Sequence, residues 1–317
     1  MGYLIVLRRV RVENANCVAG LTYGFPAITH FLGYTHALSR RIQQSHNLSL
    51  DGCTVISHHF QHHTHSSGWD HQFALTRNPL NRREKMAPFN EEGRMHMTVS
   101  LLIECNGAIA NGDNGLNALA QHLLTQCQTL RLAGGIITDI EKVEVMSYPL
   151  NADALRRLIC QHLPSFVLLD RSALLASHLA DLRTIQPEAQ MLDAWLDFAA
   201  LKRAAEKDPV SGKVEWCYLP KLTKRYLVPL LTGYQRISPL YEPGEVSHTR
   251  DTETPFCFAE AVYGVGEWRG LHHFHDLSSL MWRYRVTEQG YYCCGSQTAA
   301  LIQPDESTDE IDEISYQ

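Results

Sequence analysis

The chain has 317 residues, of which 44% are hydrophobic and 20% are charged, and its formal net charge at pH 7 is −6. This length and composition predict a globular protein with a large core, in one large domain or two smaller ones. The sequence lacks any eighteen-residue apolar run, which excludes a transmembrane helix, and it lacks a secretory signal pattern, so no membrane association is predicted. The nine irregularly spaced cysteines, without a Cys-x-x-Cys pair, predict reduced thiols in a cytoplasmic protein and exclude a disulfide framework and a zinc finger.

The negative charge is concentrated at the C-terminal end. Residues 305–317 carry six acidic side chains and no basic one, so the rest of the chain is formally neutral, and we expect these residues to form an acidic, disordered tail. Residues 1–100 carry ten Lys and Arg against six Asp and Glu. A neutral body with a basic part is typical of a protein that holds nucleic acid locally, inside an assembly, and not of a free-standing non-specific binder.

Strand and helix patterns alternate in the first half of the chain. The predicted elements are a strand over 3–13, a helix over 29–47, strands over 53–63 and 95–105, a helix over 115–133 and a strand over 136–148. Thr29 is the expected N-cap of the first helix, and Gly134-Gly135 is the expected stop of the second. This β-α-β-β-α-β order predicts an α+β fold with a ferredoxin-like domain over residues 1–150. The connection at about 66–94 is far longer than a tight hairpin and predicts an insertion.

The second half has weaker patterns. The predictions are helices over 152–163, 171–183 and 189–207, a hairpin or pair of strands over 208–230, a long proline-containing coil, a helix at 275–284 and an aromatic strand over 290–296. We expect a boundary near residue 150, so that residues 151–304 form a C-terminal α/β elaboration.

The insertion contains the basic stretch "LTRNPLNRREK", residues 75–85. Arginine grips phosphate through two-point contacts and stacks on bases, and asparagine amides pair with base edges. This chemistry allows RNA contact by the insertion, but charged runs of this kind are usually solvated loops, and the residues alone favour that simpler interpretation slightly. Arg94 and His96 lie where the insertion returns to the sheet.

A histidine cluster precedes the basic stretch. Its members are His58, His59, His62, His63, His65 and His71. Imidazoles are common metal ligands and acid–base catalysts, but only Asp70 supplies a carboxylate nearby, so we predict a polar strand and no metal site.

Two glycine-containing segments, "TYGFPAI" and "LRLAGGII", join strands to helices and could bring backbone amides close to phosphate. Simple turn geometry is the favoured explanation of both segments, and neither matches a dinucleotide-binding or Walker A motif, so no cofactor is expected. The sequence offers little support for an enzyme. Tyr3 is the only aromatic residue on the first and third strands, so RNA would be held by loops and the insertion instead of the open sheet.

Several short motifs together resemble one protein family. In chain order they are "ENAN", "GFP", "LTRNPLNR", "EEGRMHMTVSLL", "LRLAGG", "SPLYEPGEVSHTRDTETP" and "VYGVGEW", and the resemblance covers about residues 4–284. The set resembles the second Csy subunit, the Cas-five-type member of the RAMP superfamily in the type I-F CRISPR surveillance complex, or Cascade. The histidine cluster is denser than this family leads us to expect, and the acidic tail has no counterpart there.

The resemblance implies a RAMP/RRM-like domain whose insertion is a thumb, and a non-catalytic role in antiviral defence. The chain would bind the 5′ handle of the crRNA, pair with the large Csy subunit and touch a repeated backbone Csy subunit, in an assembled complex that holds target DNA. By motif position and chemistry, the predicted RNA-binding residues are Arg77, Asn78, Asn81, Arg82, Arg83, Arg94, His96, Asn14, Asn16, Arg131, Gly134 and Gly135.

Two other hypotheses stay open at this point. One is a metal-independent CRISPR endoribonuclease that processes repeat RNA, since a Cas-five-type relative does so in another subtype, and it requires a histidine or tyrosine beside the scissile phosphate. The other is a protein-binding scaffold with no direct RNA contact.

Overall fold

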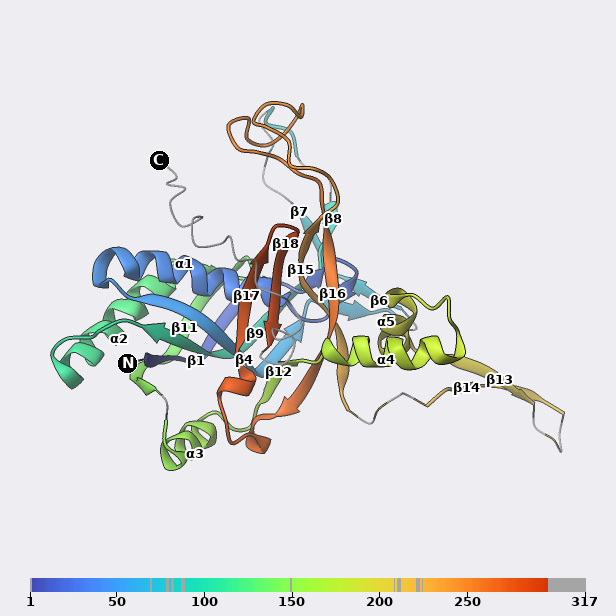
Figure 1. Ribbon diagram of the computed structural model, residues 1–317, viewed down its shortest axis with the longest axis horizontal. Helices are drawn as coiled ribbons and strands as arrows, with labels where there is room; N and C mark the ends of the chain where they lie inside the picture. The colour runs from blue at the N-terminus through green and yellow to red at the C-terminus, as the bar shows by residue number, and fades with distance from the viewer. Residues whose placement is uncertain are drawn as a thin grey trace.

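The computed structural model describes residues 2–68, 70–77, 80, 83–86, 89–148, 150–207, 209, 212–220, 223 and 225–295. Within them lie five α-helices, an antiparallel ten-stranded sheet and four two-stranded ladders (Figure 1). No described helix is both long and apolar enough to cross a membrane.

The elements follow the chain in an order of alternating strands and helices. In the first half they are β1 (Gly2–Asn16), β2 (Val18–Ala19), β3 (Thr22–Tyr23), α1 (Ile28–His46), β4 (Ser49–His62), β5 (Thr64–Ser66), β6 (His71–Phe73), β7 (Leu75–Arg77), β8 (Phe89–Glu91), β9 (Arg94–Asn106), α2 (Gly112–Gln128), β10 (Arg131–Leu132) and β11 (Gly135–Tyr148). In the second half they are α3 (Ala152–Gln161), β12 (Phe166–Asp170), α4 (Ala173–Ile185), α5 (Met191–Ala199), β13 (Arg203–Lys207), β14 (Val214–Tyr218), β15 (Leu227–Arg236), β16 (Ala259–Gly270), the 3-10 helices η1 (Leu271–His273) and η2 (Ser278–Leu280), β17 (Trp282–Thr287) and β18 (Gly290–Gly295).

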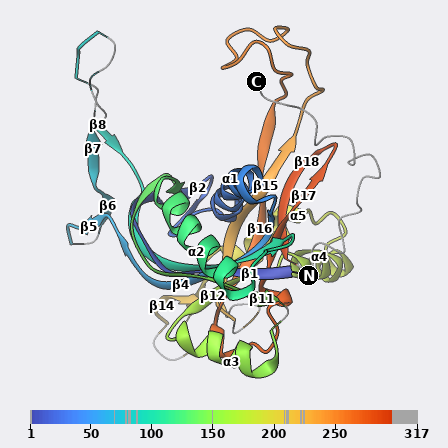
Figure 2. The ribbon, with the colours of Figure 1, turned by 90° about the vertical axis from the view of Figure 1, so that its left-hand side faces the viewer.

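Four long strands of the first half form one end of the sheet, in the order β11-β1-β9-β4, and every pairing among them is antiparallel. The apolar run of β1 is buried on both faces. Leu4 and Val6 enter the core on the side of α3, and Ile5 and Leu7 enter the core under α1 and α2. Figure 2 shows α1 and α2 on one side of these strands and α3 on the other.

Helix α1 buries one apolar face, which includes Phe31, Tyr34, Leu38 and Ile42. Its N-cap is Ala27 and not Thr29, so this boundary prediction was wrong by two residues. The helix ends at Asn47, whose φ of 54° is left-handed and whose backbone N–H donates to the Gln43 carbonyl.

The second predicted helix ends five residues early, at Gln128. The residues that follow pair as β10 with β11, and the two-residue turn between them has φ of 50° at Ala133 and 74° at Gly134. Two successive positive φ values are the mark of the turn type that suits a hairpin. Gly134 therefore forms a hairpin turn, and the prediction that it stops a helix was wrong.

The second half of the chain extends the sheet by β12, β16, β15, β18 and β17. Cys53 of β4 pairs with Ile103 of β9 on one side and with Trp282 on the other. Further along β4, Ile56 pairs with β9 and with Val167 of β12. Both outer strands, β12 and β17, thus meet the same edge of β4, so these five strands curl into a nearly closed ring against it.

Several predictions for the second half were wrong. The helix predicted over 189–207 stops at Ala199, because the chain then extends into the β13–β14 hairpin. The helix predicted at 275–284 is only the single turn η2 followed by β17. Strand β16 lies in the segment predicted as coil. Its glycine-containing sequence does not show a clear strand pattern. It forms a strand because both of its edges pair with distant strands, β12 and β15.

The Trp282 side chain closes the ring of strands at the point where β12 and β17 approach each other. Its side chain is 1% exposed, and its indole Nε1–H donates to the Leu168 carbonyl of β12 at 2.9 Å. We expect Trp282→Phe to lower the free energy of unfolding by about 2–4 kcal/mol, because the change leaves a void and an unpaired carbonyl. Urea unfolding followed by far-UV circular dichroism measures this loss. Trp216→Phe is the control, since Trp216 is 68% exposed, and its cost should stay below about 0.5 kcal/mol.

Candidate nucleic-acid interface

Predicted residues from three separate segments meet at one end of the sheet, where β1 ends, β9 begins and the β10–β11 turn folds over them. Arg94 Nη1 donates to the Asn14 carbonyl at 3.4 Å, and the Asn14 backbone N–H donates to His96 Nδ1 at 3.3 Å. The Asn16 N–H donates to the Ala133 carbonyl at 2.8 Å. The hairpin carrying Arg131, Gly134 and Gly135 is thereby held against the end of β1. We call this region the sheet-end interface.

Asn14 shapes the interface through its backbone. Its φ is 55°, and the register between β1 and β9 shifts between Val12 and Ala15. Asparagine adopts this left-handed conformation more readily than most residues, which explains the residue type at this bulge. The side chain of Asn14 is exposed, so its amide faces solvent beside Arg94.

Asn16 differs from the prediction in how it is used. Its side-chain oxygen accepts from the Val18 N–H at 3.1 Å, and its amide nitrogen donates to the Val18 carbonyl at 2.8 Å. Both ends of the amide therefore hold the chain as it leaves β1. Asn16 therefore supports the interface by holding the backbone of Val18.

The β10–β11 turn supplies an exposed cation and a close backbone approach. Arg131 is exposed, and its Nη1 donates to the Gly134 carbonyl at 3.4 Å. A Cβ atom on Gly134 would lie 4.0 Å from Arg94 Nη1, so the turn and the start of β9 are neighbours. A Cβ atom on Gly135 would lie 2.6 Å from the Glu13 carbonyl oxygen, so glycine is required there by the backbone of β1.

Arg94 is a partly buried cation of the interface. It forms an ion pair with Glu92 at 2.7 Å, and about a third of its side chain is exposed, 32%. The ring of His96 packs edge-on against that of His63, with centroids 4.2 Å apart. Burial, followed by the charge of His96, lowers the pKa of His63. The backbone of His63 also bonds to Arg94 and Ala74, which fixes the base of the insertion.

The insertion rises from this base as two short ladders. Strand β5 pairs with β6, and β7 pairs with β8, with Arg77 opposite Phe89. Figure 2 shows β7 and β8 extending away from the sheet. Arg83 and Lys85 near the tip are exposed. Asn78, Asn81 and Arg82 lie outside the described residues, and of Arg77 only the backbone is described.

Sequence reasoning missed an aromatic surface beside the insertion. The Tyr23 ring lies 5.2 Å from that of His62 and 5.0 Å from that of Phe73, and the Phe60 ring lies 5.0 Å from His62. Phe60 is 53% exposed and Tyr23 47%. The aromatic residues are visible in "TYGFP" and "HHFQHH", but only the glycine and the histidines of these stretches were interpreted from the sequence.

The histidine cluster does not converge on one point. His62 Nε2 bonds to the Gly24 carbonyl at 2.6 Å, His63 contacts His96, and His58 turns inward to Ser100 Oγ at 2.7 Å. Among the described residues, no group of three His, Cys, Asp or Glu side chains is arranged to hold a metal ion. Burial and the charge of Arg9 lower the pKa of His58 to about 4.

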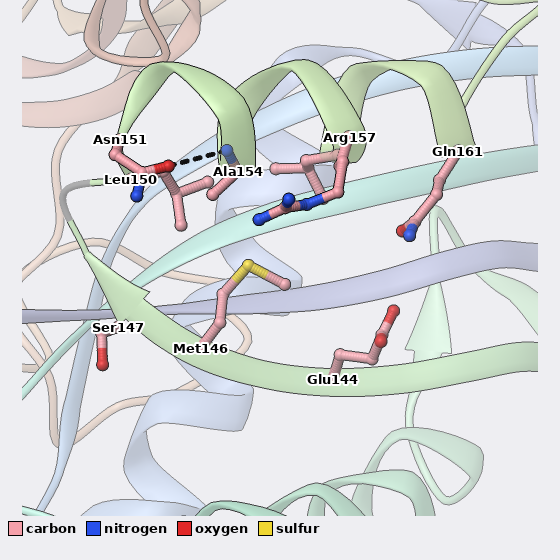
Figure 3. A pocket seen from close by; sticks show the side chains of 9 residues that line it. Glu144, Met146, Ser147, Leu150, Asn151, Ala154, Arg157 and Gln161 are labelled. Atoms are coloured by element: carbon pink, nitrogen blue, oxygen red, sulfur yellow. Dashed lines mark hydrogen bonds between the residues drawn. The ribbon is translucent and has the colours of Figure 1, made fainter.

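A separate cavity of about 410 Å³ lies between α3 and β11 (Figure 3). Glu144 of β11 and Arg157 of α3 point toward the space between the two elements, and Asn151 caps the helix by accepting the Ala154 N–H at 2.8 Å. Its described lining contains one carboxylate, Glu144, so it does not present the carboxylate pair that acid–base hydrolysis uses.

Comparison with known proteins decides the family. The family model described as CRISPR-associated protein (Cas_Csy2) matches residues 5–294. The chain belongs to the Csy2 family. It is also 37% identical over 311 residues to the CRISPR-associated protein Csy2 of Pseudomonas aeruginosa (strain UCBPP-PA14), a match that covers 91% of this chain and 94% of that protein. Sheet-end interface, insertion and curled second half all lie within the matched range.

The packing of Gly135 gives a stability test of the interface. We expect Gly135→Ala to cost about 1–3 kcal/mol of unfolding free energy, because the added methyl group meets the rigid backbone of Glu13 and Ala15. Gly33→Ala is the control. Gly33 lies on the exposed side of α1, where the nearest atom would be 3.8 Å away, so this change should stabilise by about 0.5–1 kcal/mol. Equal effects of the two substitutions in urea unfolding would contradict the described packing.

His58 predicts a pH dependence of stability. Its pKa falls from 6.5 to about 4 on folding, so the unfolded chain takes up the proton more readily. The stabilisation is complete above about pH 6.5 and is lost as the pH falls toward 4. Allowing for partial solvent screening, we expect about 1–2 kcal/mol less stability at pH 5 than at pH 7 from this residue. His58→Gln should flatten the difference in urea unfolding, and His36→Gln, on the exposed side of α1, should not.

Proposed function

We propose that this chain is a non-catalytic RNA-binding subunit of a type I-F CRISPR surveillance complex, and that its sheet-end interface and insertion hold the 5′ handle of the crRNA. Membership of the Csy2 family supports the setting. One observation carries the assignment of the interface. Arg94, Asn14 and Arg131 come from three separate segments and gather at the base of an insertion with exposed cations.

The strand order supports the proposed fold assignment. The order β11-β1-β9-β4, with α1 linking β1 to β4 and α2 linking β9 to β11, is the order of a ferredoxin-like domain, to which RAMP proteins belong. In this description residues 1–150 form the RNA-binding domain and the insertion between β4 and β9 is its thumb. Residues 151–304 form the elaboration, whose strands β12 and β17 both pair with β4.

The chemistry of the interface suits a single-stranded RNA. Arg94 and Arg131 would contact phosphates, which position the strand, while the exposed amide of Asn14 would reach a base edge. The exposed rings of Phe60 and Tyr23 would stack on unpaired bases. The three kinds of contact occur within one region, so a short unpaired segment could engage them together.

The same proposal assigns partners. The chain would pair with the large Csy subunit and touch one repeated backbone subunit, in a cytoplasmic complex that holds target DNA. Exposed apolar side chains on α5 and just after it, Leu192 at 61% and Leu201 at 71%, support burial against protein.

A non-catalytic role is supported by how the histidines are occupied. His96 accepts the Asn14 N–H, and His62 bonds to the Gly24 carbonyl, so both rings hold backbone. We expect the purified chain to leave repeat RNA intact without metal. Site-specific cleavage in that incubation would replace this proposal with the endoribonuclease hypothesis.

The handle contact is tested with the double variant Arg83→Gln and Arg131→Gln, coexpressed with the other Csy subunits. We expect weaker handle binding and a slope of log K against log salt that is shallower by about 1.4, since each lost phosphate contact removes about 0.7 for a single strand. The matched control is Arg40→Gln with Arg156→Gln, two exposed arginines on α1 and α3. Identical salt slopes for the two double variants would refute the proposed interface.

A further inference from the structure

The β13–β14 hairpin projects away from the rest of the molecule in a different direction from the insertion (Figure 1). Its strands pair in simple antiparallel register, with Arg203 opposite Tyr218, Ala205 opposite Trp216 and Lys207 opposite Val214. The sheet-end interface does not use this hairpin. Its large exposed aromatic side chains therefore require a separate explanation.

The two faces of the hairpin differ in chemistry. Directly opposed residues share a face, and alternate residues along each strand share it too. One face therefore carries Arg203, Lys207, Val214, Trp216 and Tyr218, and the other carries Glu206, Glu215 and Cys217. We call the first the ring face. Two aromatic rings and two cations lie on it, and both acids of the hairpin strands point the opposite way.

The ring face is exposed and partly preorganised. Trp216 is 68% exposed and Tyr218 60%. The guanidinium carbon of Arg203 lies over the Tyr218 ring, 4.3 Å from its centroid. Trp216 and Tyr218 are two residues apart on one strand, roughly 7 Å along it, a spacing that allows each ring to take a separate base of an extended strand.

The hairpin grows from a fixed base. Asp197 of α5 forms an ion pair with Lys202, at the entry to β13, and a hydrogen bond with His178 of α4 at 2.7 Å. Beyond β14, Arg225 lies 3.9 Å from Glu267 of β16. The segment 202–225 carries seven Lys and Arg against three Asp and Glu, so this excursion is basic while the whole chain is acidic.

We propose that the ring face of β13–β14 is a second nucleic-acid contact, a stacking platform for a single strand that is distinct from the strand held at the sheet-end interface. Accessible rings flanked by cations take unpaired bases without sequence preference. The sidedness of charge places a phosphate backbone beside Arg203 and Lys207 and away from Glu206 and Glu215. The basic excess of segment 202–225, in a chain that is acidic as a whole, favours a polyanion such as nucleic acid as the occupant over a protein surface.

The platform is tested on the full chain with fluorescein-labelled oligo-dT and oligo-rU, each fifteen nucleotides long. We expect Trp216→Ala to weaken binding of both about five- to a hundred-fold, which corresponds to the loss of one stacked base. Trp216→Phe keeps a ring and should lose less than about threefold. In the parent chain, oligonucleotide binding should quench tryptophan fluorescence, and Trp216→Phe should abolish most of that quenching.

A second pair of variants tests the cations. Arg203→Gln with Lys207→Gln should make the slope of log K against log salt shallower by about 1.4. Cys217→Ser, on the opposite face of the same strand, is the control and should change neither affinity nor slope. Far-UV circular dichroism confirms that each variant keeps its fold.

The outcomes separate this inference from the proposed handle contact. If Arg83→Gln with Arg131→Gln weakens binding while the Trp216 and Arg203 variants bind as the parent does, the platform is refuted and the sheet-end interface stands. If the Trp216 and Arg203 variants weaken binding while Arg83→Gln with Arg131→Gln binds as the parent does, the sheet-end interface is refuted and the platform stands. If the Trp216→Ala chain binds both oligonucleotides normally but no longer copurifies with the other Csy subunits, the ring face is a protein contact and the inference is wrong.

Discussion

Strand β1 pairs along both of its edges, with β9 and with β11, and the arrangement of the functional residues depends on this double pairing. The two registers bring the start of β9 and the β10–β11 turn to the same end of β1. Asn14 then interrupts one register with a left-handed residue, which turns Asn16 toward Ala133. Without the two ladders, Arg94 and Arg131 would lie on unconnected segments.

Local patterns predicted the first half of this fold because its strands and helices are long and regularly patterned. The apolar run of β1 and the buried face of α1 follow from sequence alone. The second half was harder to predict because its strands are stabilised by distant partners. Nothing local to β16 indicates that β12 and β15 flank it, and nothing near Trp282 indicates that it closes a ring against β4.

The candidate site, like the fold, could be predicted from the sequence only in part. Residue type directed attention to Arg94, His96 and Arg131, and the structure brings these residues into one region. Residue type could not show that both ends of the Asn16 amide are occupied by Val18. It also missed Phe60, because a ring matters for stacking only when folding leaves it exposed.

The ring closed by β12 and β17 leaves the ten-stranded sheet open at its other end. There β10 covers only the first two residues of β11, and among the described residues no strand covers β11 from Ile137 onward on that side. An uncovered strand edge of this kind can pair with a strand from a second copy of the chain. Asp139, Glu141 and Lys142 are exposed along it, and docking another backbone there would strip water from their charges. These three side chains therefore oppose edge-to-edge dimerisation of the free subunit.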